Sequence, residues 1–452
     1  MSVERRGCVK QPEGISQLSP CDRRTLCAQA KQFAISKWDV HAAYEKVKAN
    51  RGGAGIDGVT IEVFEQDLKN NLYKIWNRLS SGSYFPPPVK AVSIPKKSGG
   101  ERILGIPTIS DRIAQMVVKE RLELMLEPCF LEDSYGYRPA KSATQAIGVT
   151  RQRCWKYDWV LEFDIKGLFD NIRHDLLMIA IEKHVAIGEK VLGQNLSWIK
   201  LYIRRWLVAP LQQGNGSVLE RNRGTPQGGV VSPLLANLFL HYVFDKWMQK
   251  QFPENPWCRY ADDGLIHARN QGKAEYLHRE IKRRFEECGL EIHPEKTKIA
   301  YCKDDKRKGQ YAAHMSFDFL GYTFRRRRCK RASDNTFFVS FTPAVSQAAM
   351  KDMRRTIREL KVRHKTGYSL EELARWLNPV LHGWISYYGQ YRRSALDPVF
   401  RHFNKTLVRW ARRKFKTLKR HKSRAIGLFD QLSLRCPGLF AHWRFGSART
   451  FA

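Results

Sequence analysis

The sequence predicts an α+β protein with an antiparallel sheet in its middle part and a helical C-terminal third. Strand-sized segments, 257–259 and 264–267, lie on either side of Tyr260–Asp263, and two such segments joined by a tight turn form an antiparallel hairpin. Apolar residues recur at helical spacing over 350–360, with basic residues largely on the other face. A hydrophobic content of 43% is typical of globular chains, and 452 residues suffice for two or three domains.

The net charge of +35 is extreme and uneven. Residues 321–452 carry 30 Lys and Arg but only 7 Asp and Glu. Such a surface favours a polyanionic partner, because counterions released from phosphates drive the binding. The sequence has no apolar stretch of about twenty residues for a spanning helix, and its first residues lack the apolar core of a secretory signal. We therefore expect a cytoplasmic protein with no membrane partner.

The first chemical pattern along the chain is 94–107, where two strand-like pieces flank a Ser-Gly-Gly turn. Lys96 and Arg102 would then stand on paired strands of one hairpin. Arg presents a planar fork to phosphate, and Lys presents a mobile point charge. A charged hairpin is more often simply solvated, which is our interpretation of Lys97.

Two later segments have the features of a ligand site. The mostly apolar run 159–163 is followed by Asp164, a pattern typical of a buried strand with a carboxylate at its end. In isolation, a strand followed by a surface turn is the commoner interpretation. In 223–237, paired glycines after Pro226-Gln227 let the backbone approach a ligand before a helix opens. Taken alone, that segment is a loop capping a helix.

Asp262 and Asp263 form the most informative pair. Successive strand residues point to opposite faces, so the two carboxylates can share one site only at a bend, and Asp263-Gly264 is a hairpin-turn signal. Held at a turn, both suit hard cations, which take oxygen ligands. Alone, Asp-Asp before Gly is more often a solvated turn.

Together, the three acidic and glycine-rich segments resemble motifs A, B and C of reverse transcriptases, most closely the reverse transcriptase–maturase proteins of bacterial group II introns. Ser134–Pro139 and the primer-grip-like Phe317–Tyr322 extend the resemblance, which runs from about residue 40 to the C-terminus. It implies a right-hand polymerase with fingers, an antiparallel palm sheet and an α-helical thumb, called domain X in maturases. The domains implied are an N-terminal extension (1–37), fingers (38–150), palm (151–324), thumb (325–425) and a basic C-terminal tail (426–452).

The resemblance also implies two-metal phosphoryl transfer at Asp164, Asp262 and Asp263. Two cations about 3.5–4 Å apart clamp the attacking and leaving oxygens, and packing two dications so closely requires several negative ligands. Mg²⁺ is the expected ion, because it keeps waters and binds through a few carboxylates plus substrate phosphates.

Nucleotide contacts follow from the same resemblance. Lys96 and Arg102 match the residues that hold the triphosphate, and Gln227 matches the motif B glutamine that touches nucleotide and template. Phe169, five residues after Asp164, matches the aromatic residue that closes off the 2′ position, although an ordinary core Phe is the alternative.

Residues 289–298 look like motif D, whose cation helps to protonate pyrophosphate. Lys296 is the candidate for this cation, and Lys298 fits equally well. The alternative is that the lysine is simply solvated. One departure is visible, because many relatives carry a bulky apolar residue where this chain has Gly264. We expect this glycine to loosen the turn and to reduce catalytic activity.

In the C-terminal third, the basic run Arg325–Arg331 is expected to be an exposed loop that could meet phosphate, since like charges repel and are usually solvated. Ser369 opens a capping box, and the apolar face of the helix that follows is expected to reach Pro379. Trp384 and Tyr388 lie in the thumb-like segment, where we expect them to be core residues.

Basic side chains interleaved with apolar ones indicate an RNA-binding face. Residues 392–424 hold thirteen Lys and Arg and one acid, and structured RNA is recognised largely by shape and backbone. The residues predicted to bind RNA are Arg325, Arg326, Arg412, Arg413 and Lys414.

The ten cysteines contain no C-x-x-C pair and are expected to be reduced. Many group II intron proteins end in an endonuclease domain with paired cysteines and histidines, and we expect no such domain here.

The sequence therefore predicts a bacterial RNA-directed DNA polymerase that binds its group II intron RNA, assists splicing and copies it into cDNA for retrohoming. Its partners would be the intron RNA, an RNA template–DNA primer duplex, dNTPs and target DNA, and it would act at the nucleoid. Alternatives are a domesticated reverse transcriptase in phage defence or repair, and an RNA-binding splicing factor without polymerase activity.

Overall fold

A computed structural model describes residues 32–95, 99–307, 314–331, 333–445 and 451. The chain divides into two compact units. Unit 1 takes the residues up to Leu131, Gly167–Trp247 and Glu286–Leu290, and unit 2 takes Glu132–Lys166, Met248–Phe285 and the residues from Glu291 onward. The predicted extension at 1–37 falls almost wholly outside the described residues.

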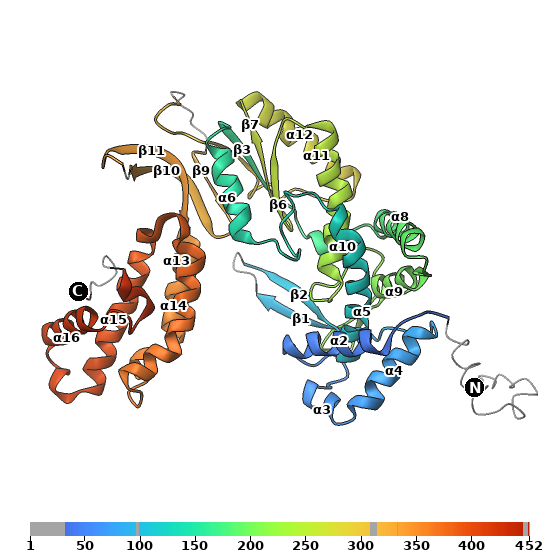
Figure 1. Cartoon of the computed structure of the whole chain (residues 1–452), viewed down its shortest axis with the longest axis horizontal. Coiled ribbons are helices and arrows are strands. Elements are labelled where there is room, and N and C mark those ends of the chain that lie inside the picture. Colours follow the sequence, from blue (N-terminus) through green and yellow to red (C-terminus); the bar gives the residue numbers. More distant parts are fainter. Residues whose placement is uncertain (1–31, 96–98, 308–313, 332, 446–450, 452) are drawn as a thin grey trace, which may run out of the picture. The chain divides into compact units, whose positions relative to one another are not determined.

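Unit 1 is mainly helical (Figure 1). Its centre is α5, which is capped by the Thr108 side chain and buries most of its first ten residues, Asp111 included. The Asp111 carboxylate accepts hydrogen bonds from Tyr84 and from the Trp206 indole, at 3.0 and 2.7 Å. The helices are α2 (Lys37–Ala49), α3 (Ile61–Glu65), α4 (Leu68–Ser80), α5 (Ile109–Leu126), η2 (Glu127–Cys129), α7 (Leu168–Asn171), α8 (His174–Leu192), α9 (Ser197–Val208), α10 (Ser232–Leu240) and the π-helical turn η3 (His241–Asp245).

The predicted hairpin around residue 100 is present in unit 1. Strands β1 (Val89–Pro95) and β2 (Glu101–Ile106) pair antiparallel, with Ile94 opposite Arg102. They continue into a four-stranded sheet of order β2-β1-β4-β5, whose last members are β4 (Leu211–Gln212) and β5 (Val218–Leu219).

Unit 2 is built on a four-stranded sheet of order β6-β7-β3-β8, in which every neighbouring pair is antiparallel. The strands are β3 (Trp159–Asp164), β6 (Trp257–Tyr260), β7 (Asp263–Ala268) and β8 (Lys298–Tyr301). Helix α6 (Ala143–Cys154) packs on the face that bears Val160, and α12 (Gln271–Glu287) covers the face of Phe163 through Phe285. The predicted antiparallel palm sheet is confirmed.

A second antiparallel sheet, of order β11-β10-β9, follows in unit 2. Its strands are β9 (Ser316–Phe319), β10 (Tyr322–Lys330) and β11 (Phe337–Val345). The predicted loop at Arg325–Arg331 is therefore wrong for all but its last residue. Tyr322 and Phe324 are buried at alternate positions, and they extend the strand into the arginine run, which pairs with β11 as far as Lys330.

The C-terminal part of unit 2 is helical, as predicted. Its members are α13 (Gln347–Glu359), η4 (Val362–His364), α14 (Leu370–Arg392), η5 (Arg393–Leu396), α15 (Asp397–Lys414), η6 (Lys416–Leu418), α16 (Lys422–Arg435) and η7 (Ala441–Arg444). Trp410 and Trp443 are buried at the centre of the bundle, and Trp384 and Tyr388 pack against its core, as predicted.

Helix α14 begins with the predicted capping box of Ser369 and Glu372, but it does not end near Pro379. The helix continues to Arg392. Pro379 is exposed, as is Arg375 one turn earlier, so the carbonyl that loses its partner faces water. Burial of Leu377 and Leu381 on the other face keeps the helix continuous.

No helix among the described residues is long and apolar enough to cross a membrane. The seven cysteines in the described part of the chain are free.

Candidate active site

The Asp pair lies at the β6–β7 hairpin of unit 2. Tyr260 pairs with Asp263 across the two strands, so the turn consists of Ala261 and Asp262, and Asp263 already belongs to β7. Ala261 has a φ of 56°, a left-handed conformation that is rare for a residue with a side chain. The sequence placed the turn at Asp263-Gly264, which is wrong by two residues. The bend still lets the adjacent carboxylates avoid opposite faces.

Asp164 joins this pair through strand register. It is the last residue of β3 and lies directly opposite Asp263 of β7. Residues so paired in antiparallel strands have Cα atoms about 5 Å apart. Asp164 is thus brought to the same edge of the unit 2 sheet as Asp262 and Asp263, which follow it by almost a hundred positions.

Burial makes these carboxylates unusual acids. The pKa of Asp263 rises to about 7, first because burial disfavours its charged form and then because Asp262 and Asp164 repel it. Burial also raises the pKa of Asp262, with Asp164 adding to the effect. The site therefore holds more negative charge than its own surroundings stabilise.

Lys296 supplies positive charge next to the acids. Its Nζ lies 2.5 Å from Asp164 Oδ2, and this hydrogen bond raises the pKa of the ammonium group. Lys298 lies 3.2 Å from Glu162 instead. The geometry therefore separates two lysines that the sequence left equivalent, since Lys296 contacts the catalytic candidate Asp164.

A pocket of about 300 Å³ opens at this edge of unit 2. Its lining residues are Glu162, Phe163, Asp164, Asp263, Gly264, Glu295, Lys296, Lys298, Asp318 and Phe319. Sequence reasoning missed Glu162 and Asp318. Burial raises the pKa of Glu162 to about 7, and nearby Asp318 and Asp263 add to that rise. The sequence could have indicated Glu162, because alternate residues of a strand point to the same face, and Glu162 lies two residues before Asp164.

Gly264 is not part of the turn, so the expectation of a loosened turn is wrong. It lies in β7 opposite Phe163, and a Cβ at this position would come within 2.1–2.6 Å of the Phe163 ring. The ring occupies the space of the missing side chain.

Arg259 supports the turn from behind, and sequence reasoning missed it as well. It is fully buried and donates hydrogen bonds to the Ala261 carbonyl and to Ser134 Oγ, at 3.2 and 2.8 Å. Close packing adds to this support, because a Cβ on Gly136 would lie 2.4 Å from the Ala261 nitrogen. This contact explains why the segment Ser134–Pro139 needs a glycine at that position.

The chemistry of the donor set fits a hard dication. Carboxylates that are buried and repel one another gain most from a bound cation, and oxygen donors are the ligands that Mg²⁺ prefers. As they stand, the described His, Cys, Asp and Glu side chains form no group of three that could hold an ion. An ion at Asp164 would therefore have to compete with Lys296.

The predicted nucleotide-binding residues other than Lys296 belong to unit 1 or lie outside the described residues. Phe169 is half-buried in α7, and its carbonyl accepts a hydrogen bond from Thr225 N at 2.7 Å. The Gln227 carbonyl accepts a hydrogen bond from Gly105 N of β2, also at 2.7 Å. Arg102 is exposed on the same strand. Unit 1 thus joins these three segments, whereas Lys96 is outside the described residues.

The primer-grip-like turn between β9 and β10 is held by the thumb helix α14. Leu320 and Gly321 both adopt positive φ there, at 50° and 78°. Tyr387 Oη donates to the Leu320 carbonyl at 2.9 Å, and a Cβ on Gly321 would meet the Tyr388 hydroxyl at 2.9 Å. Both contacts lie within unit 2.

The predicted RNA-binding residues occupy two places in unit 2. Arg325 and Arg326 are exposed on β10. At the end of α15, Arg412 donates to the Lys419 carbonyl at 3.1 Å and Lys414 to the Tyr368 carbonyl at 2.5 Å, while Arg413 is exposed and bonds to His364. Consecutive helix residues point in different directions, and each of the three has a partner of its own.

Two family models match this chain. Residues 94–324 match a family described as reverse transcriptase (RNA-dependent DNA polymerase), a region that includes all three aspartates and covers half of the chain. Residues 350–426 match a second family, described as group II intron, maturase-specific domain.

Curated relatives agree with these matches. The group II intron-encoded protein LtrA of Lactococcus lactis is 32% identical over 276 residues, which are 59% of this chain and 42% of that protein. Protein YkfC of Escherichia coli K12 is 29% identical over 319 residues, covering 61% of this chain and 77% of YkfC. The matched region thus spans less than half of the Lactococcus protein.

Among solved structures, a telomerase from Candida albicans, in complex with a fragment of telomeric RNA, is similar with a TM-score of 0.43 and 13% identity. The match covers 85% of this chain and 70% of that one.

Proposed function

This chain belongs to the reverse transcriptase (RNA-dependent DNA polymerase) family, and we propose that it is an RNA-directed DNA polymerase that also binds a group II intron RNA and assists its splicing. The polymerase part rests on one observation, the register pair of Asp164 and Asp263 beside Asp262. The maturase part rests on the maturase-specific match at 350–426, within the most basic third of the chain.

Two Mg²⁺ ions would be held by Asp164, Asp262 and Asp263. When bound, such ions polarise the reacting phosphoryl group and stabilise the charge on the attacking and departing oxygens. Because the carboxylates are buried and repel one another, bound cations would stabilise them. Arg259 keeps the turn that carries Asp262 in place.

The chain's other residues would bind and orient the nucleotide. Arg102, together with Lys96, would hold the triphosphate, and the Phe169 ring would exclude a 2′-hydroxyl by contact. Gln227 would orient the nucleotide on the template from the loop anchored to β2.

Lys296 would donate the proton that the departing pyrophosphate takes up. The Lys296 ammonium carries its proton at neutral pH, and the hydrogen bond that raises its pKa also holds that proton on Nζ while Asp164 is bound. Release from Asp164 would be needed first, since this carboxylate now accepts the hydrogen bond.

The partners of this reaction would be an RNA template paired with a DNA primer, dNTPs and the intron RNA. Copying the intron into cDNA at a DNA target would make the protein an agent of retrohoming. The charge of the C-terminal third favours such polyanionic partners.

Primer extension on an RNA template with Mg²⁺ and dNTPs tests the proposal. We expect the unmodified protein to make DNA and Asp262→Ala to make none, while RNA binding by filter assay stays within about twofold. Glu254→Gln, which removes an exposed acid of the same unit, is the matched control. DNA synthesis by Asp262→Ala would refute the site, and RNA binding without any synthesis by the unmodified protein would favour a splicing factor.

A further inference from the structure

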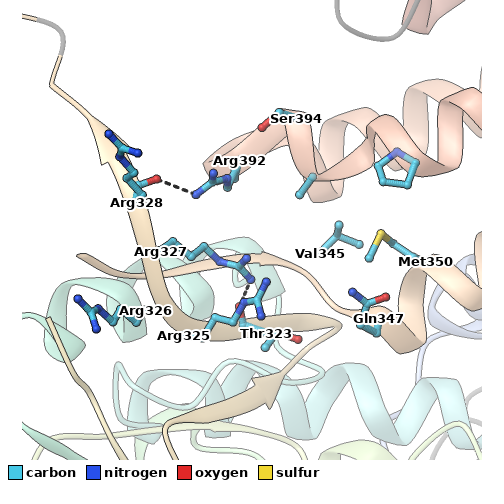
Figure 2. A pocket seen from close by; sticks show the side chains of 12 residues that line it. Thr323, Arg325, Arg326, Arg327, Arg328, Val345, Gln347, Met350, Arg392 and Ser394 are labelled. Atoms are coloured by element: carbon cyan, nitrogen blue, oxygen red, sulfur yellow. Dashed lines mark hydrogen bonds between the residues drawn. The ribbon is translucent and has the colours of Figure 1, made fainter. Parts of the chain in front are cut away.

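An arginine-lined pocket of about 500 Å³ lies in unit 2 between the second sheet and the helical bundle (Figure 2). Strand β10 contributes Thr323 and four consecutive arginines, Arg325–Arg328. The other walls come from the end of β11, the start of α13, the end of α14 with η5, and the start of α15. Those residues are Val345, Gln347, Met350, Arg392, Ser394, Ala395 and Pro398.

The pocket concentrates positive charge, and no acidic residue lines it. Five of its lining residues are arginines. Of these five, only Arg326 has an acidic partner among the described residues, Asp305, and that contact is loose at 3.9 Å. The pKa of Arg327 falls to about 10, first through burial and then because Arg325 and Arg392 repel its charged form.

Hydrogen bonds fix the geometry of this charge. Arg327 donates to the carbonyls of Thr342 and Thr323, at 3.2 and 3.1 Å, and Arg392 donates to the Arg328 carbonyl at 3.1 Å. These bonds use only part of each guanidinium, which has five N–H donors. The Arg325 side chain has no hydrogen bond or ion pair among the described residues.

A second source of positive potential adjoins the arginines. Helix α13 begins at Gln347, which lines the pocket, and its thirteen residues carry a dipole whose positive end lies there. Opposite the charged wall, Val345, Met350 and Pro398 provide apolar surface. Figure 2 shows Arg325, Arg327 and Arg392 on one side and Val345 and Met350 on the other.

We propose that this pocket binds one phosphodiester group of a nucleic-acid strand, with the adjoining sugar and base against the apolar wall. Guanidinium forks match the paired oxygens of a phosphate, and the volume lies within the range of sites that hold small organic molecules. The inference rests on the proposed RNA binding and names a contact for it. The residues that would contact the phosphate are Arg325, Arg327 and Arg392, whereas Arg326 would stay paired with Asp305.

The charge test compares two double variants of the full chain. Arg325→Gln with Arg392→Gln removes two pocket charges, and Arg331→Gln with Arg355→Gln removes two exposed charges that pair with acids outside the pocket. Binding of a labelled 30-nucleotide RNA is measured by anisotropy across KCl concentrations. We expect the pocket variant to bind roughly tenfold more weakly at 0.15 M salt, with a salt slope lower by about one unit, and the control to change less than threefold.

A filling test separates a pocket from a charged surface. Ser394 is exposed and lines the pocket, so Ser394→Trp fills it while every charge stays. Ser386→Trp, at an exposed position of α14 outside the pocket, is the control. Melting temperatures within about 2 °C of the parent establish that the variants fold. Loss of RNA affinity in Ser394→Trp alone supports the pocket, and equal affinity of both variants overturns it.

Two further arms identify the source of the phosphate. The same 30-nucleotide sequence as DNA is measured in parallel, and a loss confined to RNA assigns the pocket to an RNA strand. Equal losses on both assign it to the phosphate backbone of either strand. Affinity of the unmodified protein for RNA no greater than its affinity for heparin would defeat the proposed RNA binding itself. Normal binding with no pocket effect would defeat only the pocket.

Discussion

Replacing Asp263 by Asn should make the metal-free protein more stable while it abolishes DNA synthesis. The amide keeps the shape of the carboxylate but carries no charge at the crowded edge shared with Asp164 and Asp262. Acids crowded together in this way are held in place against their own repulsion, so removing one charge should stabilise the folded state.

The structure sets the size of this effect. The pKa of Asp263 rises from 3.8 to about 7, and ~1.4 kcal/mol per tenfold change in acidity makes ionisation in the folded state cost up to ~4 kcal/mol at pH 8. Asp263 is only partly shielded from water, so screening reduces this to ~2 kcal/mol. For a domain of 150–250 residues, ~2 kcal/mol corresponds to a melting temperature about 4–8 °C higher.

The sign of the pH dependence is fixed by the same shift. Well below pH 3.8 the carboxyl is protonated in both states and costs nothing. As pH rises towards 7, the unfolded chain releases its proton while the folded protein retains it, so folding stability falls, and the full penalty remains above pH 7. The advantage of Asp263→Asn should therefore be small at pH 4.5, roughly a quarter of its full size, and complete at pH 8.

Scanning fluorimetry in EDTA at pH 4.5 and pH 8 measures this difference, with Glu254→Gln as a control for loss of an exposed acid. Mg²⁺ at pH 8 should raise the melting temperature of the parent more than that of the variant, since the ion then offsets the repulsion. An Asn variant that melts no higher than the parent at pH 8 in EDTA would refute the proposed charge frustration. So would an advantage of equal size at both pH values.

Three other predictions concern single positions. Phe169→Ala should raise ribonucleotide incorporation relative to deoxynucleotides at least tenfold in primer extension, and an unchanged ratio would remove Phe169 from the site. Gly264→Ala should destabilise the protein by about 1–3 kcal/mol in urea unfolding because its Cβ overlaps the Phe163 ring, and Phe163→Leu should restore part of the loss. Arg413→Ala should lower the salt slope of RNA binding by about one unit, whereas Arg412→Ala, which breaks a bond to the Lys419 carbonyl, should mainly lower the melting temperature; the reverse pattern would contradict this assignment.

The sequence singled out the three acids because the patterns around them are local. An apolar run that ends in Asp164 and an Asp pair between strand-sized segments are visible without any knowledge of pairing. Whether the acids come together depends on the register of β3 and β7, which places Asp164 opposite Asp263 and not opposite a residue next to it. A one-residue slip would turn every side chain of β3 to the other face, and only the assembled sheet determines which register is adopted.

Arg259 was overlooked and the arginine run was misjudged for a common reason. Charged residues are almost always exposed, so a charged position is taken as surface or loop. Arg259 is instead buried against Ser134 and Ala261, which accept its hydrogen bonds. The run at Arg325–Arg328 forms a strand because β11 supplies a ladder of backbone partners. In both cases the compensating partner is set by pairing in the fold, since Ser134 lies 125 positions from Arg259 and β11 lies beside β10 only once the hairpin has formed.

The distribution of charge indicates how one chain can treat phosphate in two ways. In its C-terminal third, arginines that lack counter-charges, such as Arg325 and Arg392, should attract phosphate without any metal. The edge that bears Asp164 and Asp263 repels phosphate until cations reverse its sign, because its own lysine offsets only part of the negative charge. Binding of a strand and reaction at its end should therefore respond differently to Mg²⁺. Removal of the ion should abolish synthesis but leave RNA affinity almost unchanged, and this separation follows from the placement of charge alone.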